Sequence, residues 1–272
     1  MQVPEAKSWM KFALIALIGA GAASMSYGDS FVVTYAPAGV QAPNTTTLCG
    51  SDPTCWIGEE TFPSSSVPTN ANFTTIASTG SPSGSITGVY SGALSISSAN
   101  QYGGADGTGY FATVSNNNYT LTLTASGAAT GVPGVNYFGL WFSALDAGNK
   151  LQFYNGNTLL FSFTPAQFQT LVGACPNASN PFCGNPNNLT QDKGEQFAFL
   201  NFYDLDGYFT KVVFTETTNA GFESDNHTVG YMDPVDPTGT VIGATPEPGS
   251  IVLLLTGLLA LIGLRGRFAW NA

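Results

Sequence analysis

Hydrophobic and polar positions follow a strand pattern most clearly in the middle of the chain. Residues 119–125 (YTLTLTA) place apolar side chains at every other position, the period of a strand with one buried face. Residues 136–145 (NYFGLWFSAL) are aromatic or apolar almost throughout, which is typical of a strand buried on both faces. Residues 151–154 and 158–163 flank Asn155-Gly156-Asn157, a good hairpin turn because Asn and Gly tolerate positive φ.

The rest of the pattern also favours short strands. Further strands are expected at residues 89–96, 109–114, 196–203, 208–216 and 227–232, with a tight hairpin turn at 204–207. No internal repeat with a fixed period is present. Many short strands with little helix predict an all-β fold, a two-sheet antiparallel sandwich with one short helix.

The one expected helix follows the hairpin. Thr164 is placed to cap it, Pro165 occupies the first helical position, and Gln167 completes a capping box. Its apolar face is expected to hold Phe168, Leu171 and Val172, and Gly173 to end it.

The N-terminal segment, residues 1–28, has the anatomy of a secretory signal peptide. Lys7 and Lys11 precede an apolar run at 12–23, and small residues continue to Gly28. Cleavage after Ala23, Ser26 or Gly28 fits the pattern equally. The alternative is an uncleaved membrane anchor, for which the apolar run is short. Such a segment implies export through the secretion translocon.

The C-terminal segment, residues 246–267, combines three features. Pro246-Glu247-Pro248 is followed by the apolar stretch 251–264 and then by Arg265 and Arg267. The stretch is marginal for spanning a bilayer, but the arginines match the positive-inside rule. The alternative is a buried core helix, which would normally show a polar face.

This arrangement resembles the PEP-CTERM sorting signal. The resemblance implies that Pro246, Glu247 and Pro248 are recognised by an exosortase-type membrane enzyme, with Arg265 and Arg267 on the cytoplasmic side. It further implies transient anchoring in the inner membrane, followed by release to the cell surface or into extracellular polysaccharide. Residues 29–245 would then be the exported body, within which 61–108 are rich in Ser, Thr and Gly and read as loops, short strands or a linker.

Part of the body resembles one group of exosortase-dependent surface proteins. The matching pieces are residues 137–156, 199–214 and 221–230. The group is similar to jelly-roll, lectin-like sandwiches, and no enzymatic activity is implied by it.

Composition narrows the function further. Only 9% of the residues are charged, and between Asp29 and Thr245 fifteen Asp or Glu face three Lys and no Arg. Such a body repels phosphate backbones, so nucleic-acid binding is not expected.

The four cysteines form two close pairs, Cys49/Cys55 and Cys175/Cys183. An even count in an exported chain favours two disulfides. The alternative is a zinc site, which would prefer a two-residue spacing and additional histidines, whereas the chain has a single histidine.

A cluster of oxygen-bearing residues suggests structural calcium. Asp146 and Asn149 follow the strand at 136–145, and Glu223, Asp225 and Asn226 lie in the expected loop GFESDN. Calcium takes six to eight such oxygens. The alternative is that these residues, and the acids of the 204–207 turn, serve only as turn formers. No other cofactor is expected.

Hydrolysis and sugar binding are the two remaining candidate chemistries. Hydrolysis would use His227, but the chain lacks a Gly-x-Ser-x-Gly elbow and no local feature selects a pair of carboxylates, so an enzyme is not expected. Sugar binding would use exposed aromatic rings such as Trp56 or Trp141, although Trp141 is expected to serve packing. The sequence therefore predicts a non-enzymatic structural or adhesive surface protein, with a carbohydrate-binding module as the rival and a secreted hydrolase as the least supported class.

Overall fold

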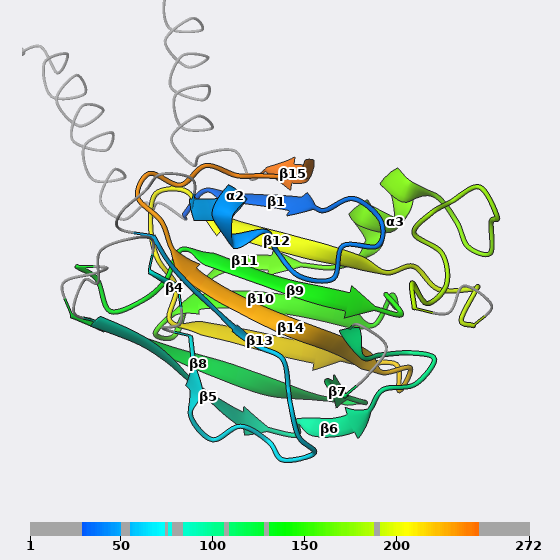
Figure 1. Cartoon of the computed structure of the whole chain (residues 1–272), viewed down its shortest axis with the longest axis horizontal. Helices are drawn as coiled ribbons and strands as arrows, with labels where there is room; N and C mark the ends of the chain where they lie inside the picture. Colours follow the sequence, from blue (N-terminus) through cyan, green and yellow to red (C-terminus); the bar gives the residue numbers. More distant parts are fainter. Residues whose placement is uncertain are drawn as a thin grey trace, which may run out of the picture. The chain divides into compact units, whose positions relative to one another are not determined.

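Two antiparallel β-sheets face each other across a core of aromatic and aliphatic side chains (Figure 1). The structure is a computed structural model, and it describes residues 29–49, 55–73, 76–77, 84–105, 109–127, 131–187 and 191–244. Residues Asp29–Pro246 form one compact unit. The predicted all-β sandwich is confirmed for this unit.

The larger sheet has nine strands. In order across the sheet these are β15 (Thr240–Ala244), β1 (Phe31–Tyr35), β12 (Ala198–Asp204), β9 (Tyr137–Ser143), β14 (Phe222–Tyr231), β2 (Trp56–Glu60) and β4 (Ile76–Ala77). Strand β7 (Tyr110–Val114) also pairs with β14, and β6 (Ser95–Ser98) pairs with β7.

The smaller sheet has six strands. Its order is β11 (Thr158–Phe163), β10 (Asn149–Asn155), β13 (Lys211–Glu216), β8 (Asn117–Gly127), β5 (Gly84–Gly92) and β3 (Ala71–Asn72). The 155–157 turn joins β10 to β11 as predicted, and Gly156 adopts the positive φ of 58° that the turn requires.

The sequence pattern sets which faces are buried. Tyr119, Leu121 and Leu123 of β8 point into the core while the threonines between them are more exposed, as the alternation predicts. Every residue of β9 is buried, because its inner face packs in the main core and its outer face is covered by other segments of the chain. Each fully buried large apolar side chain contributes about 1.5–3 kcal/mol, so these two strands anchor the sandwich.

The N-terminal half of the body is part of the same sandwich. Strand β1 pairs with β12, β2 pairs with β14, and β5 pairs with β8 along nine residues. The Ser/Thr/Gly-rich part at 61–108 contains β3 to β6, so it supplies strands to both sheets. Strands β1, β2 and β15 were not predicted, because their sequences lack a clear alternation of apolar and polar residues.

Three expected strand boundaries were wrong. The strand expected at 89–96 is broken after Gly92, and its two parts, β5 and β6, belong to different sheets. All of the expected loop GFESDN except Gly221 lies within β14, where a register shift between Asp225 and Thr228 forms a bulge and Asn226 has a φ of 48°. The 204–207 turn leads from β12 in the larger sheet to β13 in the smaller one, so it is not a hairpin.

The expected helix is present as α3 (Ala166–Val172), but its N-terminus differs from the prediction. Pro165 is the N-cap and no side-chain capping bond forms, so the Thr164–Gln167 capping box is absent. Phe168 is buried, whereas Leu171 is 55% exposed, because so short a helix covers the sheet with little more than one residue. A second short helix, α2 (Thr45–Cys49), was not predicted.

Candidate functional site

Both predicted disulfides are formed. Cys49 pairs with Cys55 and Cys175 pairs with Cys183, with Cα atoms 5.4 and 5.6 Å apart. No free cysteine remains among the described residues. The pairs join cysteines six and eight positions apart, and formed disulfides fit an oxidising environment better than zinc binding.

The predicted sorting residues lie outside the described residues. This applies to Pro246, Glu247, Pro248, Arg265 and Arg267, and equally to the signal peptide at 1–28. Within the described part of the chain, no helix has the length and apolar character needed to cross a membrane.

The five predicted calcium ligands separate into two groups. Asp146, Asn149 and Glu223 lie at one end of the sandwich. With the Asn149 amide assigned in the orientation that satisfies both neighbours, its oxygen accepts from Asp146 N (3.2 Å) and its nitrogen donates to Gly221 O (2.8 Å), which links the β9–β10 loop to the start of β14. Asp225 and Asn226 are held elsewhere by protein groups.

Asp225 and Asn226 are instead held by hydrogen bonds to other segments of the chain. Asp225 Oδ2 accepts from Ala105 N at 2.8 Å, and Asn226 Nδ2 donates to Gln41 O at 2.8 Å. Among the described residues, no three acidic, histidine or cysteine side chains converge closely enough to hold a metal. The five residues therefore do not form one coordination shell, and calcium stays a prediction.

The first group belongs to a larger acidic cluster. It comprises Asp146, Glu223, Glu216 on β13 and, from the loop before β12, Asp192 and Glu195, which sequence reasoning missed because an isolated acid in a loop carries no pattern. We call these five residues the end cluster.

Burial raises the pKa of several members of the end cluster. It raises the pKa of Glu223 to about 8, assisted by the charge of Asp146. Burial and Glu195 raise the pKa of Asp146 to about 6, and burial and Asp146 raise that of Asp192 to about 6. Glu223 is only 8% exposed and its Oε2 has no hydrogen-bond partner among the described residues.

Glu216 behaves differently. Burial opposes its ionisation, but its carboxylate accepts from Asn116 N (2.7 Å), Thr218 Oγ1 (2.7 Å), Thr218 N (2.5 Å) and Asn219 N (2.8 Å). These bonds lower its pKa to about 2. Glu216 is thus a permanent anion that fixes the β13–β14 loop.

His227 lies in the core between the two sheets. Its Nδ1 is 2.9 Å from the Tyr90 hydroxyl and its Nε2 is 2.9 Å from Ser224 Oγ, which is in turn 3.2 Å from the Tyr119 hydroxyl. The imidazole stacks on the Phe214 ring with centroids 5.0 Å apart. Burial lowers its pKa to about 3, so the ring is neutral. Both ring nitrogens are engaged by hydroxyl groups, so the ring is not oriented by a carboxylate as in a catalytic triad.

The tryptophans considered for sugar binding are buried. Trp56 is 2% exposed in the main core, and Trp141 is fully buried against Phe199 and Ala105, as its expected packing role requires. Tyr102, at 43% exposed, is the one aromatic residue among the exposed large hydrophobic side chains that the structure describes.

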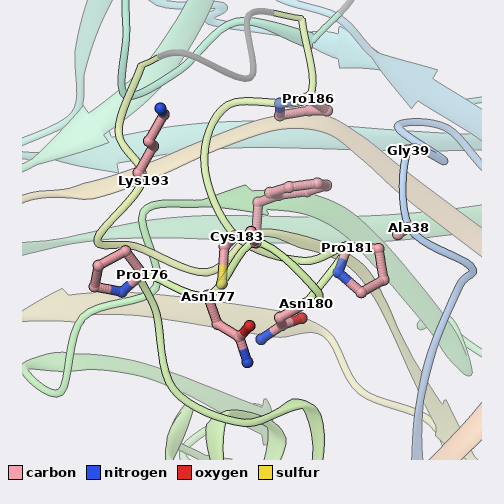
Figure 2. A pocket seen from close by; sticks show the side chains of 11 residues that line it. Ala38, Gly39, Pro176, Asn177, Asn180, Pro181, Cys183, Pro186 and Lys193 are labelled. Carbon is pink, nitrogen blue, oxygen red and sulfur yellow. The ribbon is translucent and has the colours of Figure 1, made fainter.

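A surface hollow of about 640 Å³ lies beside the Cys175–Cys183 loop (Figure 2). Its wall combines Pro176, Asn177, Pro181 and Pro186 of this region with Ala38 and Gly39 from the loop after β1. Lys193 stands at the rim. The Asn180 side chain holds the wall in shape, since it donates to Gly173 O (3.1 Å) and accepts from Phe182 N (3.0 Å).

Three comparisons with known proteins gave no further lead. Neither a family model, nor a curated relative, nor a solved structure matches this chain.

Proposed function

We propose that this chain is an exported bacterial surface or matrix protein with a non-enzymatic structural or adhesive role. In this proposal the chain is exported through the translocon, its signal peptide is removed, and an exosortase-type enzyme processes the C-terminal segment. The observation that carries the proposal is the position of the two limits of the compact unit. It runs from Asp29 to Pro246, so it begins directly after the predicted signal peptide and ends at the first residue of the predicted sorting segment.

Two features of the body support export. Both disulfides close within the compact unit, and such bonds persist in oxidising compartments. The acidic, lysine-poor body also suits solubility outside the cell. The chain passes repeatedly from one sheet to the other, which supports the further proposal of a jelly-roll-like sandwich.

The test is mass spectrometry of the protein recovered from cells and medium of an exosortase-containing host. The proposal expects a product that lacks both terminal segments and has four oxidised cysteines. A full-length product with its C-terminal stretch intact would contradict processing, because the chain would then be a permanent anchor or retain a core helix.

Carbohydrate binding is the second candidate, and the hollow beside the Cys175–Cys183 loop favours it. The hollow is rigid, since a disulfide and three prolines form its wall, and Lys193 supplies a cation for an acidic sugar. A glycan array probed with the mature protein tests this function. Binding that is lost in Lys193→Gln and kept in Lys150→Gln would support it, because Lys150 lies on β10 and does not line the hollow.

A further inference from the structure

The first residues of the compact unit form part of a second acidic site, which is separate from the end cluster. Ser30 N donates to Asp206 Oδ1 at 2.8 Å and Ser30 Oγ to Asp206 Oδ2 at 3.3 Å. Leu205 N donates back to Ser30 O at 2.9 Å. The backbone is therefore fixed from Ser30 onward, immediately before β1, and this places Asp29 beside Asp204. We call Asp29, Asp204 and Asp206 the entry cluster.

Asp204 is the member of the entry cluster that most needs a cation. It is fully buried, its Oδ1 accepts from Gly207 N at 3.0 Å, and its Oδ2 receives no N–H or O–H donor. That oxygen faces the Asp29 carboxyl group. The backbone of Gly207 shows how close the two carboxyl groups are. A Cβ atom placed on Gly207 would lie 3.1 Å from Asp204 Oδ2 and 2.5 Å from Asp29 Oδ2, so both oxygens border the same small space.

The two carboxyl groups interact directly. Each carboxyl group affects the ionisation of the other. Burial, followed by the charge of Asp29, raises the pKa of Asp204 to about 8, and burial raises that of Asp29. The groups that act on this pair are acids, and no lysine or arginine among the described residues is ion-paired with it. The site lacks a positive charge.

Removal of the signal peptide can supply that charge, and the position of the cut decides whether it does. If the chain begins at Asp29, covalent geometry places its α-ammonium about 3–5 Å from its own carboxyl group. That carboxyl group lies near Asp204 Oδ2, so the ammonium lies next to the pair of acids. Cleavage after Ser26 or Ala23 would instead leave two or five residues ahead of Asp29, and each residue moves the amine by up to about 3.5 Å.

We propose that the signal peptide is cleaved between Gly28 and Asp29, and that the new α-ammonium is the counter-ion of the entry cluster. The inference deepens the proposed export and rests on it. Ser26 and Gly28 place small residues at the third and first positions before this bond, as leader cleavage requires. An opposite charge at such short range favours the ionised carboxylates, so processing stabilises the entry of β1.

The first test is N-terminal sequencing and intact mass of the full chain after export by a heterologous secretion system. The inference expects Asp29 as the first residue. A product beginning at Ser24 or Tyr27 would overturn the inference while leaving export intact. A product that keeps Met1 would overturn the proposed export itself.

The second test asks whether the amine is the counter-ion. A variant with Gly-Ser inserted between Gly28 and Asp29, whose mature form begins with the inserted Gly, moves the amine away from the cluster. At pH 7 we expect its thermal midpoint to be lower than that of the native mature protein. The difference should vanish in an Asp204→Asn background and persist in Asp236→Asn, an exposed control. Equal midpoints for native and extended proteins would overturn the counter-ion role.

A third measurement remains informative if Asp204→Asn does not fold. Reductive ¹³C-methylation of the mature native protein labels the α-amine and Lys150, Lys193 and Lys211, which gives four assignable NMR signals. The α-amine is expected to titrate above its ordinary pKa of about 7.7–8.0. An ordinary value would show that the cluster does not hold the amine.

Discussion

The Tyr90 hydroxyl and His227 Nδ1 lie 2.9 Å apart and join the two sheets across the core. Tyr90 belongs to β5 of the smaller sheet and His227 to β14 of the larger one. Through Ser224 and Tyr119 the chain of hydrogen bonds returns to β8 of the smaller sheet. A buried polar network that is fully satisfied fixes how two sheets align, which apolar contacts alone do less specifically.

This network predicts the effect of removing one hydroxyl group. Tyr90→Phe and Ser224→Ala should each lower the free energy of unfolding by about 1–3 kcal/mol, because each leaves a buried imidazole nitrogen without a partner. Urea unfolding followed by fluorescence measures the change. Tyr102→Phe is the matched control, since that ring is exposed and its change should stay within about 0.5 kcal/mol. Equal effects in the core and at Tyr102 would contradict the structural role of the network.

His227 also predicts an acid-sensitive contribution to stability. Its pKa is about 3 when folded and about 6.5 in an unfolded chain, so the unfolded state binds more protons between these values. The contribution of His227 is therefore complete above about pH 6.5 and is lost as the pH falls toward 3. Over this range the free energy of unfolding should change by up to about 1.4 kcal/mol per pH unit, and this dependence should be absent in His227→Gln. An unchanged slope in that variant, measured by urea unfolding from pH 3.5 to 7, would contradict a neutral buried imidazole.

Glu223 predicts the opposite trend. Because burial raises its folded pKa to about 8, from about 4.3 when unfolded, the folded state binds more protons between these values. Its contribution is present below about pH 4.3 and is lost as the pH rises through 8. Glu223→Gln should therefore be more stable relative to the native protein at pH 8.5 than at pH 5, and the exposed Asp236→Asn should show no such difference. Thermal unfolding of the native protein and both variants at the two pH values measures this difference.

The calcium prediction has a test that separates its two groups of residues. If Asp146 and Glu223 hold the ion, 1 mM calcium should raise the thermal midpoint, and Glu223→Gln should abolish the rise. Asp225→Asn should keep it, because the Asp225 carboxylate is already held by the N–H groups of Ala105 and Asn226. A thermal midpoint that changes with neither calcium nor a chelator would show that the end cluster is held by protons and hydrogen bonds alone.

Each disulfide should contribute comparable stability. The pairs are separated by six and eight residues, and closing such loops in the unfolded chain corresponds to about 2–3 kcal/mol. The double variant Cys175→Ala, Cys183→Ala should have a free energy of unfolding lower by that amount. A reductant should destabilise this variant further, because it breaks the remaining Cys49–Cys55 bond. Insensitivity of the native protein to reductant would argue against either bond forming in the exported chain.

The sorting segment predicts a processing defect. Replacing Pro246, Glu247 and Pro248 by Ala should leave the chain uncleaved in the membrane, because the prolines keep the recognised residues extended. Immunoblots of membrane and medium fractions follow this. A variant with Asp236→Ala and Pro237→Ala should still be released, and normal release of the triple variant would refute recognition of the tripeptide.

The local pattern of the sequence determined the strongest strands, the hairpin at 155–157 and the all-β class, because period-2 burial and turn chemistry depend on neighbours in the chain. It also determined the disulfide pairs, since short loops leave few alternatives. The tertiary structure decided which sheet each strand joins, and it split the 89–96 segment between the two. It alone showed that Glu223 and Asp225 belong to a strand, that His227 faces hydroxyl groups, and that Asp29 meets Asp204. These relationships join residues up to 175 positions apart, and such long-range pairing leaves no periodic trace in the sequence.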